Sequence, residues 1–475
     1  MEEKELLTEM IADAIENKRF KELCEKLEDV NPVDIAEAMD GLDEKQVTVV
    51  FRLLKKETAA DAFAYMEPDV QEALIKSLSD TELTVIVEDM EMDDAADLIE
   101  EMPANVVARI LKNSSPERRK TINELLLYPE DSAGSIMTPE YVSLKRTMTV
   151  AEAFAHIRKV GLDKETVYTC YVTENRKLIG VVSVKRLLVS SEETKIEDIM
   201  HDNFIEVHTT DDKEFVAGQI KKYGYLALPV VDAEQRLVGI VTIDDAMEVI
   251  EDEATEDMEK MAAMSPSEKP YLKTGMIETW KQRIPWLLIL MVSATFTGMI
   301  ISGFENALAA CTALTAFIPM LMDTGGNSGA QASVTVIRAL ALGDVAPKDI
   351  FLVIRKELRV AALCAGTLAG ANFVKILLVE MLLLKTLPLT AYGFAISGVV
   401  CLTLFVTVIF AKLIGCTLPI AAKAVKLDPA VVASRLCCIL CSRHIYFLFD
   451  KKCRRKLFLR HNFISVIEIQ FFGIL

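Results

Sequence analysis

The pattern of hydrophobic positions divides the chain into two halves. Up to about residue 260, apolar residues fall in short periodic stretches separated by charged ones, as in a soluble protein. A short helix over 274–283 is then expected to end at Pro285. Beyond it, apolar runs long enough to cross a bilayer cover 285–303, 307–338, 359–384, 391–414 and 431–449. We therefore predict soluble modules followed by about five membrane-spanning helices.

Residues 1–130 read as a series of short helices. Related Ala-rich phrases recur around Ala36, Ala60 and Ala96, at spacings of 24 and 36 residues, both multiples of 12. Such a repeat predicts short helices stacked as a small superhelical array. Acidic residues are dense near its end, where Asp93 and Asp97 lie four residues apart and share a helix face. Two interpretations remain open for them, a solvated acidic face or a cation site.

Residues 131–253 contain two copies of one pattern, each of about 60 residues. In the first copy, strand-like 142–144 precedes a helix-like 149–156 and two strand-like segments, 167–172 and 178–183. In the second copy the corresponding strands are 204–207, 227–232 and 237–242. Each copy is βαββα-like, so the pair predicts one pseudo-symmetric α/β module.

This module resembles a tandem CBS pair, a family that commonly binds adenosine nucleotides such as ATP. The family's ribose pattern, Gly-h-h-Thr/Ser-x-x-Asp, is present in the second copy from Gly239 through Thr242 to Asp245. In the first copy Arg186 stands where the acid is expected. The resemblance therefore implies one nucleotide site, at Thr242 and Asp245, in a regulatory module rather than an enzyme.

An acidic helix is predicted over 244–260. Its carboxylates at Asp245, Glu248, Asp252 and Glu256 fall on one face. Like charges at that spacing repel each other, and a partly hydrated divalent cation would relieve the repulsion. A solvated connector remains the alternative.

The most informative stretch is the polar run inside the second apolar segment, residues 323–331. A lipid-facing helix would not tolerate Asp323, Asn327 and Gln331. Oxygen donors combined with small residues such as Gly325 are typical of a pore lining for a hard cation. Gly325 and Gly329 also form a small-xxx-small pattern, which needs only helix packing. Glu305, in a short outer loop, is a candidate cation entrance.

Charge is distributed unevenly over the 475 residues, whose net charge is −18. The first 270 residues carry a balance of −29 and the remainder +11. The acidic half argues against nucleic acid and suits a surface that collects cations. Its polar start is unlike a signal peptide, and basic residues in the membrane loops place that half in the cytoplasm. One CxxC among ten cysteines indicates neither a zinc site nor a disulfide framework.

The order of these modules resembles the MgtE family of magnesium channels and transporters. The resemblance covers about residues 1–434 and includes Pro319 and the Gly325-Gly-Asn-x-Gly motif. It implies a multidomain membrane protein of the cell membrane: an all-α superhelical N-terminal domain (1–130), the CBS pair (131–253), a connecting plug helix (254–283) and a transmembrane pore domain of about five helices (284–434).

The same resemblance implies the mechanism and the metal ligands. It implies a homodimeric channel, not an enzyme, whose cytoplasmic domains bind Mg²⁺ and close together over the pore. The implied sensor acids are Asp93 and Asp97 in the array, Asp245 and Glu248 at the CBS exit, and Glu253, Glu256 and Asp257 on the plug helix. Asp323, Gly325, Asn327 and Glu305 are the pore candidates.

The tail departs from the family pattern. Residues 428–434 fit it, but 435–475 are rich in cysteine and in basic residues on the side expected to face outward. Ser442 stands about where the family carries a buried pore Asp. We hypothesise a frame-shifted or otherwise altered tail, which fails if the unshifted coding sequence of close relatives gives the same tail.

Two other functions stay open at this stage. One is a CBS-gated transporter of another divalent cation, Co²⁺ or Mn²⁺, which a competition profile would distinguish. The other is a nucleotide-sensing membrane protein with a crippled pore, which would bind nucleotide without flux.

Overall fold

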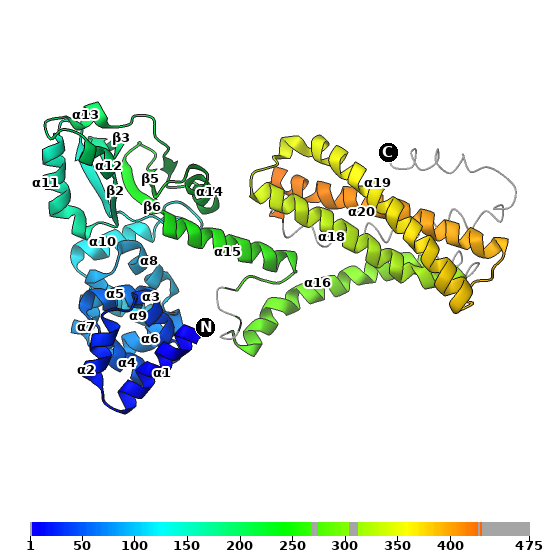
Figure 1. The fold of residues 1–475 in the computed structure, drawn as a ribbon, viewed down its shortest axis with the longest axis horizontal. Coiled ribbons are helices and arrows are strands. Elements are labelled where there is room, and N and C mark those ends of the chain that lie inside the picture. Colours follow the sequence, from blue (N-terminus) through cyan, green and yellow to red (C-terminus); the bar gives the residue numbers. More distant parts are fainter. Residues whose placement is uncertain (1, 268–270, 272–273, 304–311, 426–427, 430–475) are drawn as a thin grey trace. The chain divides into compact units, whose positions relative to one another are not determined.

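The computed structural model describes residues 2–267, 271, 274–303, 312–425 and 428–429. The chain divides into two compact units, Met1–Glu253 and Ala254–Leu475, which are described separately (Figure 1). Glu305, the predicted fifth span 431–449 and the tail 435–475 lie outside the described residues.

The first unit begins with a regular series of helices. From α3 onward the helices start at residues 32, 44, 56, 68, 80, 92, 104 and 116, so each begins 12 residues after the one before it. The predicted 12-residue repeat is therefore confirmed. The bounds are α1 (Glu2–Glu16), α2 (Phe20–Leu27), α3 (Pro32–Met39), α4 (Glu44–Leu53), α5 (Lys56–Ala64), α6 (Pro68–Ser77), α7 (Asp80–Asp89), α8 (Met92–Glu101), α9 (Ala104–Asn113) and α10 (Pro116–Leu125).

The repeat arises because the helices are short and amphipathic and begin at defined caps. Alternate helices stack, so α3 packs on α5, α5 on α7 and α7 on α9, while α8 packs on α10. Their apolar faces form one continuous core that includes Ile35, Phe63 and Ile86. The side chains of Asp43 and Ser79 cap α4 and α7 with complete capping boxes. Each repeat packs its apolar face against its neighbours, as expected of a solenoid, and α8 and α10 also place Ala96 and Leu125 in the core of the second CBS copy.

A buried arginine joins the last repeats. Arg118 of α10 is 6% exposed, and its Nη2 donates hydrogen bonds to the carbonyl oxygens of Met90 and Glu91. Those carbonyls lie between the end of α7 and the start of α8. Arg118 thus fixes the turn that presents the acidic start of α8.

The CBS pair forms two three-stranded sheets, one per copy. In each sheet the first two strands are parallel and the last two antiparallel, which confirms the predicted duplication. Thr149 caps α11 with a capping box, as the helix start required. The first copy contains β1 (Tyr141–Lys145), α11 (Val150–Val160), η1 (Gly161–Asp163), β2 (Thr166–Glu174), β3 (Lys177–Ser183) and α12 (Val184–Val189). The second contains α13 (Ile196–Ile199), β4 (Val207–His208), α14 (Lys213–Tyr223), β5 (Ala227–Val231) and β6 (Leu237–Thr242).

One strand of the second copy was predicted wrongly. The expected strand 204–207 is only β4, Val207–His208, paired with Val230 and Val231 of β5. Residues 204–206 are only partly buried, so their apolar character does not reflect a place in the sheet.

The acidic helix is confirmed as α15 (Ile243–Met261). The next helix, α16 (Met276–Gly303), runs through Pro285, so the predicted helix end at that proline is wrong. Proline within a membrane helix is tolerated where neighbouring groups or local adjustments satisfy the freed carbonyl.

The second unit continues with η2 (Thr312–Phe317), α18 (Ile318–Ala341), η3 (Pro347–Asp349), α19 (Ile350–Lys375), the π-helical segment η4 (Ile376–Leu383) and α20 (Ala391–Ala424). α20 packs against both α18 and α19. Among the described residues two helical segments are long and apolar enough to cross a membrane, Pro347–Leu383 and Ala391–Ala424.

The predicted bounds of two spans differ from these helices. α19 begins nine residues before the expected 359. It includes Arg355 and Lys356, which lie outside the apolar run. α20 continues to Ala424 rather than 414, and Lys423 lies in its last turn. Charged residues near helix ends extend these helices beyond the apolar run that predicted them.

The role of Arg118 can be tested by Arg118→Met. Its charged hydrogen bonds to buried carbonyls are worth about 1.5–3 kcal/mol each, so the turn at residues 90–91 should open more easily. We expect faster hydrogen exchange in peptides covering the start of α8. Lys120→Met, at an exposed position of the same helix, is the control and should leave the exchange unchanged. Equal exchange in Arg118→Met and the parent chain would contradict this role.

Candidate metal centre and pore

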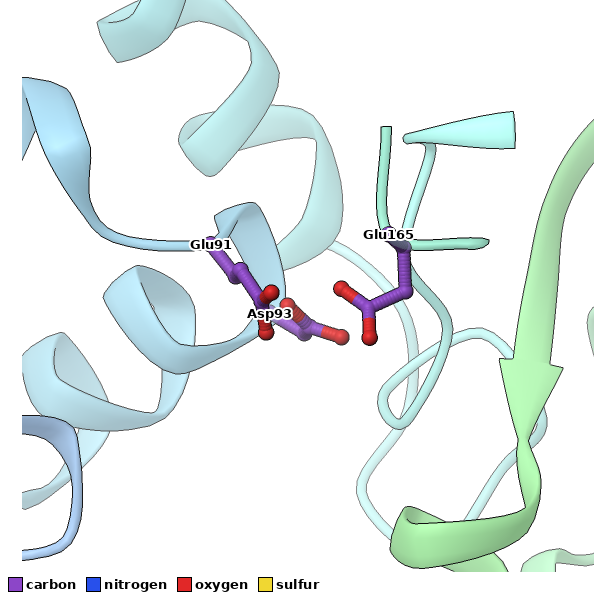
Figure 2. A group of neighbouring side chains, drawn as sticks. All are labelled: Glu91, Asp93 and Glu165. Carbon is purple, nitrogen blue, oxygen red and sulfur yellow. The ribbon is translucent and has the colours of Figure 1, made fainter. Parts of the chain in front are cut away.

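Three carboxylates meet where the helical array approaches the first CBS copy. Glu91 and Asp93 begin α8, and Glu165 directly precedes β2 (Figure 2). One carboxylate oxygen from each lies within 4.8 Å of the others. The backbone fixes both sides, since Arg118 holds the Glu91 carbonyl and the Glu165 N–H donates to the Glu140 carbonyl at 3.0 Å.

These three carboxylates lie close together at different depths, with Asp93 buried, Glu165 half-buried and Glu91 exposed. Asp93 is 9% exposed, and burial followed by the charge of Asp245 raises its pKa well above the ordinary value. Burial followed by the charges of Glu91 and Asp93 raises the pKa of Glu165 to about 9. In the part of the chain that the structure describes, none of the three forms an ion pair, and Glu165 Oε2 is buried without a hydrogen-bond partner.

A second group of carboxylates extends this cluster to the start of α15. Burial raises the pKa of Asp94 and of Asp97 to about 7, and Asp245 and Glu248 contribute to both shifts. The pKa values of Asp245 and Glu248 are raised too, again mainly by burial. We call the whole group the acidic interface; it consists of Glu91, Asp93, Asp94, Asp97, Glu165, Asp244, Asp245 and Glu248.

The chemistry of this donor set fits a hard divalent cation. Every side chain offers oxygen, the ligand atom that Mg²⁺ prefers, and Mg²⁺ keeps several waters, so it tolerates a loose cage. A cation here would offset the repulsion that raises these pKa values. The orphaned Glu165 Oε2 gives such a cation a ready ligand.

The structure brings four predicted sensor residues into this interface, namely Asp93, Asp97, Asp245 and Glu248. Glu253 is the last residue of the first unit, where it contributes with Asp252 to the raised pKa of Lys213. Glu256 and Asp257 belong to the second unit. The ammonium of Lys260 there lies 2.7 Å from Glu256 Oε1 and 2.8 Å from Asp428 Oδ2.

The predicted nucleotide residues contact each other. The Thr242 hydroxyl donates a hydrogen bond to Asp245 Oδ2, at the junction of β6 and α15. Asp245 thus belongs both to the ribose pattern and to the acidic interface. In the first copy Arg186 Nη1 lies 2.5 Å from His201 Nε2.

The pore candidates lie on α18, which has two different faces. Gly325, Ser328 and Gly329 are buried. Asp323, Asn327 and Gln331 are exposed, four residues apart along the opposite side. The buried face of α18 therefore fits the helix-packing interpretation of this stretch, and its exposed face fits the pore-lining interpretation. Lys375 and Glu380 lie within the predicted span 359–384. The Lys375 ammonium is 3.3 Å from Glu380 Oε1.

Sequence analysis missed Glu91, Asp94, Glu165 and Asp244 as site residues. Glu165 is the clearest omission, because it lies 72 residues from Asp93 and belongs to another module. A local signal existed for Glu91 and Asp94 in the acidic density around α8, but periodicity cannot tell a buried acid from a solvated one.

Comparison with known families covers most of the chain. Residues 30–131 match the MgtE intracellular N domain, residues 133–193 and 196–252 match CBS domains, and residues 318–440 match the divalent cation transporter domain of MgtE.

Individual relatives agree with these matches. The magnesium transporter MgtE of Thermus thermophilus is 36% identical over 92% of this chain and 95% of its own length. That of Bacillus subtilis is 30% identical over 88% and 90%. The crystal structure of the soluble part of a magnesium transporter is 32% identical, covers 53% of this chain and 99% of its own, and superposes with a TM-score of 0.50. These domain matches and these relatives together cover most of the chain, and the chain belongs to the MgtE family of magnesium transporters.

Proposed function

We propose that this chain forms a homodimeric, multi-pass Mg²⁺ channel of the cell membrane that closes when cytoplasmic Mg²⁺ binds its acidic sites. The observation that carries the gating proposal is the acidic interface, where buried, half-buried and exposed carboxylates from α8, the first CBS copy and α15 lie near each other without an ion pair among the described residues. Mg²⁺ at this interface would favour the arrangement in which these elements pack together.

The interface suits a gate because its ligands come from separate elements. A cation that binds only the packed arrangement shifts the population toward it. Moving a gate from mostly open to mostly closed needs a difference of about 5.5 kcal/mol in binding free energy, which several weak sites can share. Glu253, Glu256 and Asp257, on the same helix α15, are the further sensor ligands of this proposal.

For conduction we propose the open face of α18. Asp323 and Asn327 offer oxygen ligands on the exposed side of the helix, while Gly325 is buried on the opposite side. Glu305 remains the proposed entrance. An adenosine nucleotide at Thr242 and Asp245 remains the proposed second ligand of the CBS pair, and it would meet the acidic interface at Asp245.

Flux measurements test the function directly. The full chain in liposomes that contain a magnesium dye should take up Mg²⁺ when the cytoplasmic face is held at low Mg²⁺, and the uptake should fall at high Mg²⁺. Control liposomes lack protein. Uptake that ignores cytoplasmic Mg²⁺ would contradict the gate, and absence of uptake would contradict the channel.

Glu165→Gln tests whether the acidic interface is a cation site. Removing this carboxylate relieves repulsion without Mg²⁺, so hydrogen exchange at the start of α8 should slow in the Mg²⁺-free chain. The further slowing on adding Mg²⁺ should shrink, because one ligand is lost. A Mg²⁺ concentration of 100 times the dissociation constant stabilises the bound form by about 2.7 kcal/mol. This is the largest gain in protection expected at that concentration.

The matched control is Glu193→Gln, an exposed acid of the same CBS copy. It should respond to Mg²⁺ as the parent chain does. An unchanged Mg²⁺ response in Glu165→Gln would exclude Glu165 as a ligand.

The pH dependence of Mg²⁺ binding follows from the raised pKa values. Asp94 and Asp97 have pKa values of about 7 in the packed structure, against an ordinary 3.8. Their neutral forms support Mg²⁺-free packing at low pH, and this support is lost as the pH rises through about 7. Mg²⁺ needs the ionised forms, so its affinity should increase from pH 6 to pH 8. Mg²⁺ titrations followed by hydrogen exchange would measure this, and equal affinity at both pH values would contradict it.

A further inference from the structure

A buried ion pair lies within the second unit, between α19 and α20. Lys412 Nζ of α20 is 3.3 Å from Glu357 Oε1 of α19. The two side chains are 7% and 15% exposed. Lys412 lies inside an apolar span, where a charged residue is costly and is seldom kept without a role.

The position of Lys412 on α20 connects this pair to α18. Gly415, three residues later, occupies a neighbouring face of the same helix. A Cβ atom at Gly415 would overlap the carbonyl oxygen of Gly329, so α18 and α20 touch backbone to backbone there. The stretch of α20 from Lys412 to Gly415 therefore contacts α19 through an ion pair and α18 through a glycine contact.

A second contact sets the register of α18 on α20. Lys423 Nζ donates a hydrogen bond to the carbonyl oxygen of Leu340 at 3.1 Å, near the end of α18. Gly415–Gly329 and Lys423–Leu340 show that the two helices run parallel. Along this pair of helices Lys412 lies one turn before Gly415, at the level of the polar run of α18.

The opposite side of α18 from Gly329 carries Asp323 and Asn327. Because close-packed helices cannot slide or turn independently, the rotation of α20 determines how α18 presents this polar face. Losing the charge pair would free α20 to turn and would displace the Gly415–Gly329 contact.

We propose that Glu357 and Lys412 are positioning residues for ion passage: their ion pair fixes the rotation and depth of α20 on α19 and, through Gly415 and Gly329, the presentation of the polar face of α18. Neither side chain needs to touch the ion. The proposal uses the transport function for its second readout, but its first readout requires no flux.

The first readout is chemical accessibility in the full chain. Asn327→Cys is introduced, and its reaction with a water-soluble thiol reagent is followed by mass spectrometry of the peptide that contains it. Glu357→Gln and Lys412→Met should each change the reaction rate at least about threefold, the size expected when contacting residues are coupled. The exchanged pair, Glu357→Lys with Lys412→Glu, should restore the rate.

Two further variants keep this test decisive. Lys356→Met removes an exposed charge of α19 beside Glu357 and should leave the rate unchanged. If the exchanged pair fails to fold, Lys412→Arg, which keeps the charge, should retain the parent rate. Unchanged rates in both single variants, or a Lys412→Arg rate equal to that of Lys412→Met, would overturn the proposal.

The second readout is Mg²⁺ uptake. A positioning role predicts that both single variants lower the maximal uptake and that the exchanged pair recovers it. If Glu357→Gln and Lys412→Met changed the uptake in opposite directions and left the labelling rate of Asn327→Cys unchanged, the two charges would act on the ion directly. That result would overturn the positioning role. A parent chain without uptake would fail the channel proposal, while the labelling series would still decide the role of the pair.

Discussion

The first unit depends on one electrostatic constraint, the packing of carboxylates against carboxylates. Asp93 is almost fully buried beside Glu91 and Glu165, and Asp97 faces the start of α15. In the described part of the chain Arg118 approaches this region, but it donates to backbone carbonyls rather than to these side chains. We propose that protons or a shared cation favour this arrangement, so that packing would depend on both pH and cation concentration.

The solenoid and the CBS pair serve this constraint by presenting the acids on rigid supports. The 12-residue repeat fixes where α8 begins, and the backbone of the first CBS copy fixes Glu165. The second copy places Asp245 at the first turn of α15, held by Thr242. A change in cation occupancy can therefore act on the start of a helix that continues to Met261 rather than on a loose loop.

Much of this organisation could be predicted from sequence because it is periodic. The spacing of Ala36, Ala60 and Ala96 predicted the repeat, and the duplicated strands predicted the CBS pair. The proximity of Glu165 to Glu91 and Asp93 could not be predicted, since it arises only when two modules meet. The two faces of α18 were both present in its residue types, but only packing assigns Gly329 to one face and Asn327 to the other. Pro285 misled because a proline need not end a helix, and α16 continues through it.

The central claim is that Mg²⁺ replaces protons at the acidic interface. The most direct measurement is the proton release when Mg²⁺ is added to the full chain in weakly buffered solution near pH 7, where Asp94 and Asp97 are partly protonated. Addition of Mg²⁺ at pH 7 should release protons saturably, and the release should be smaller in Asp97→Asn. Mg²⁺ binding without proton release at pH 7 would contradict it.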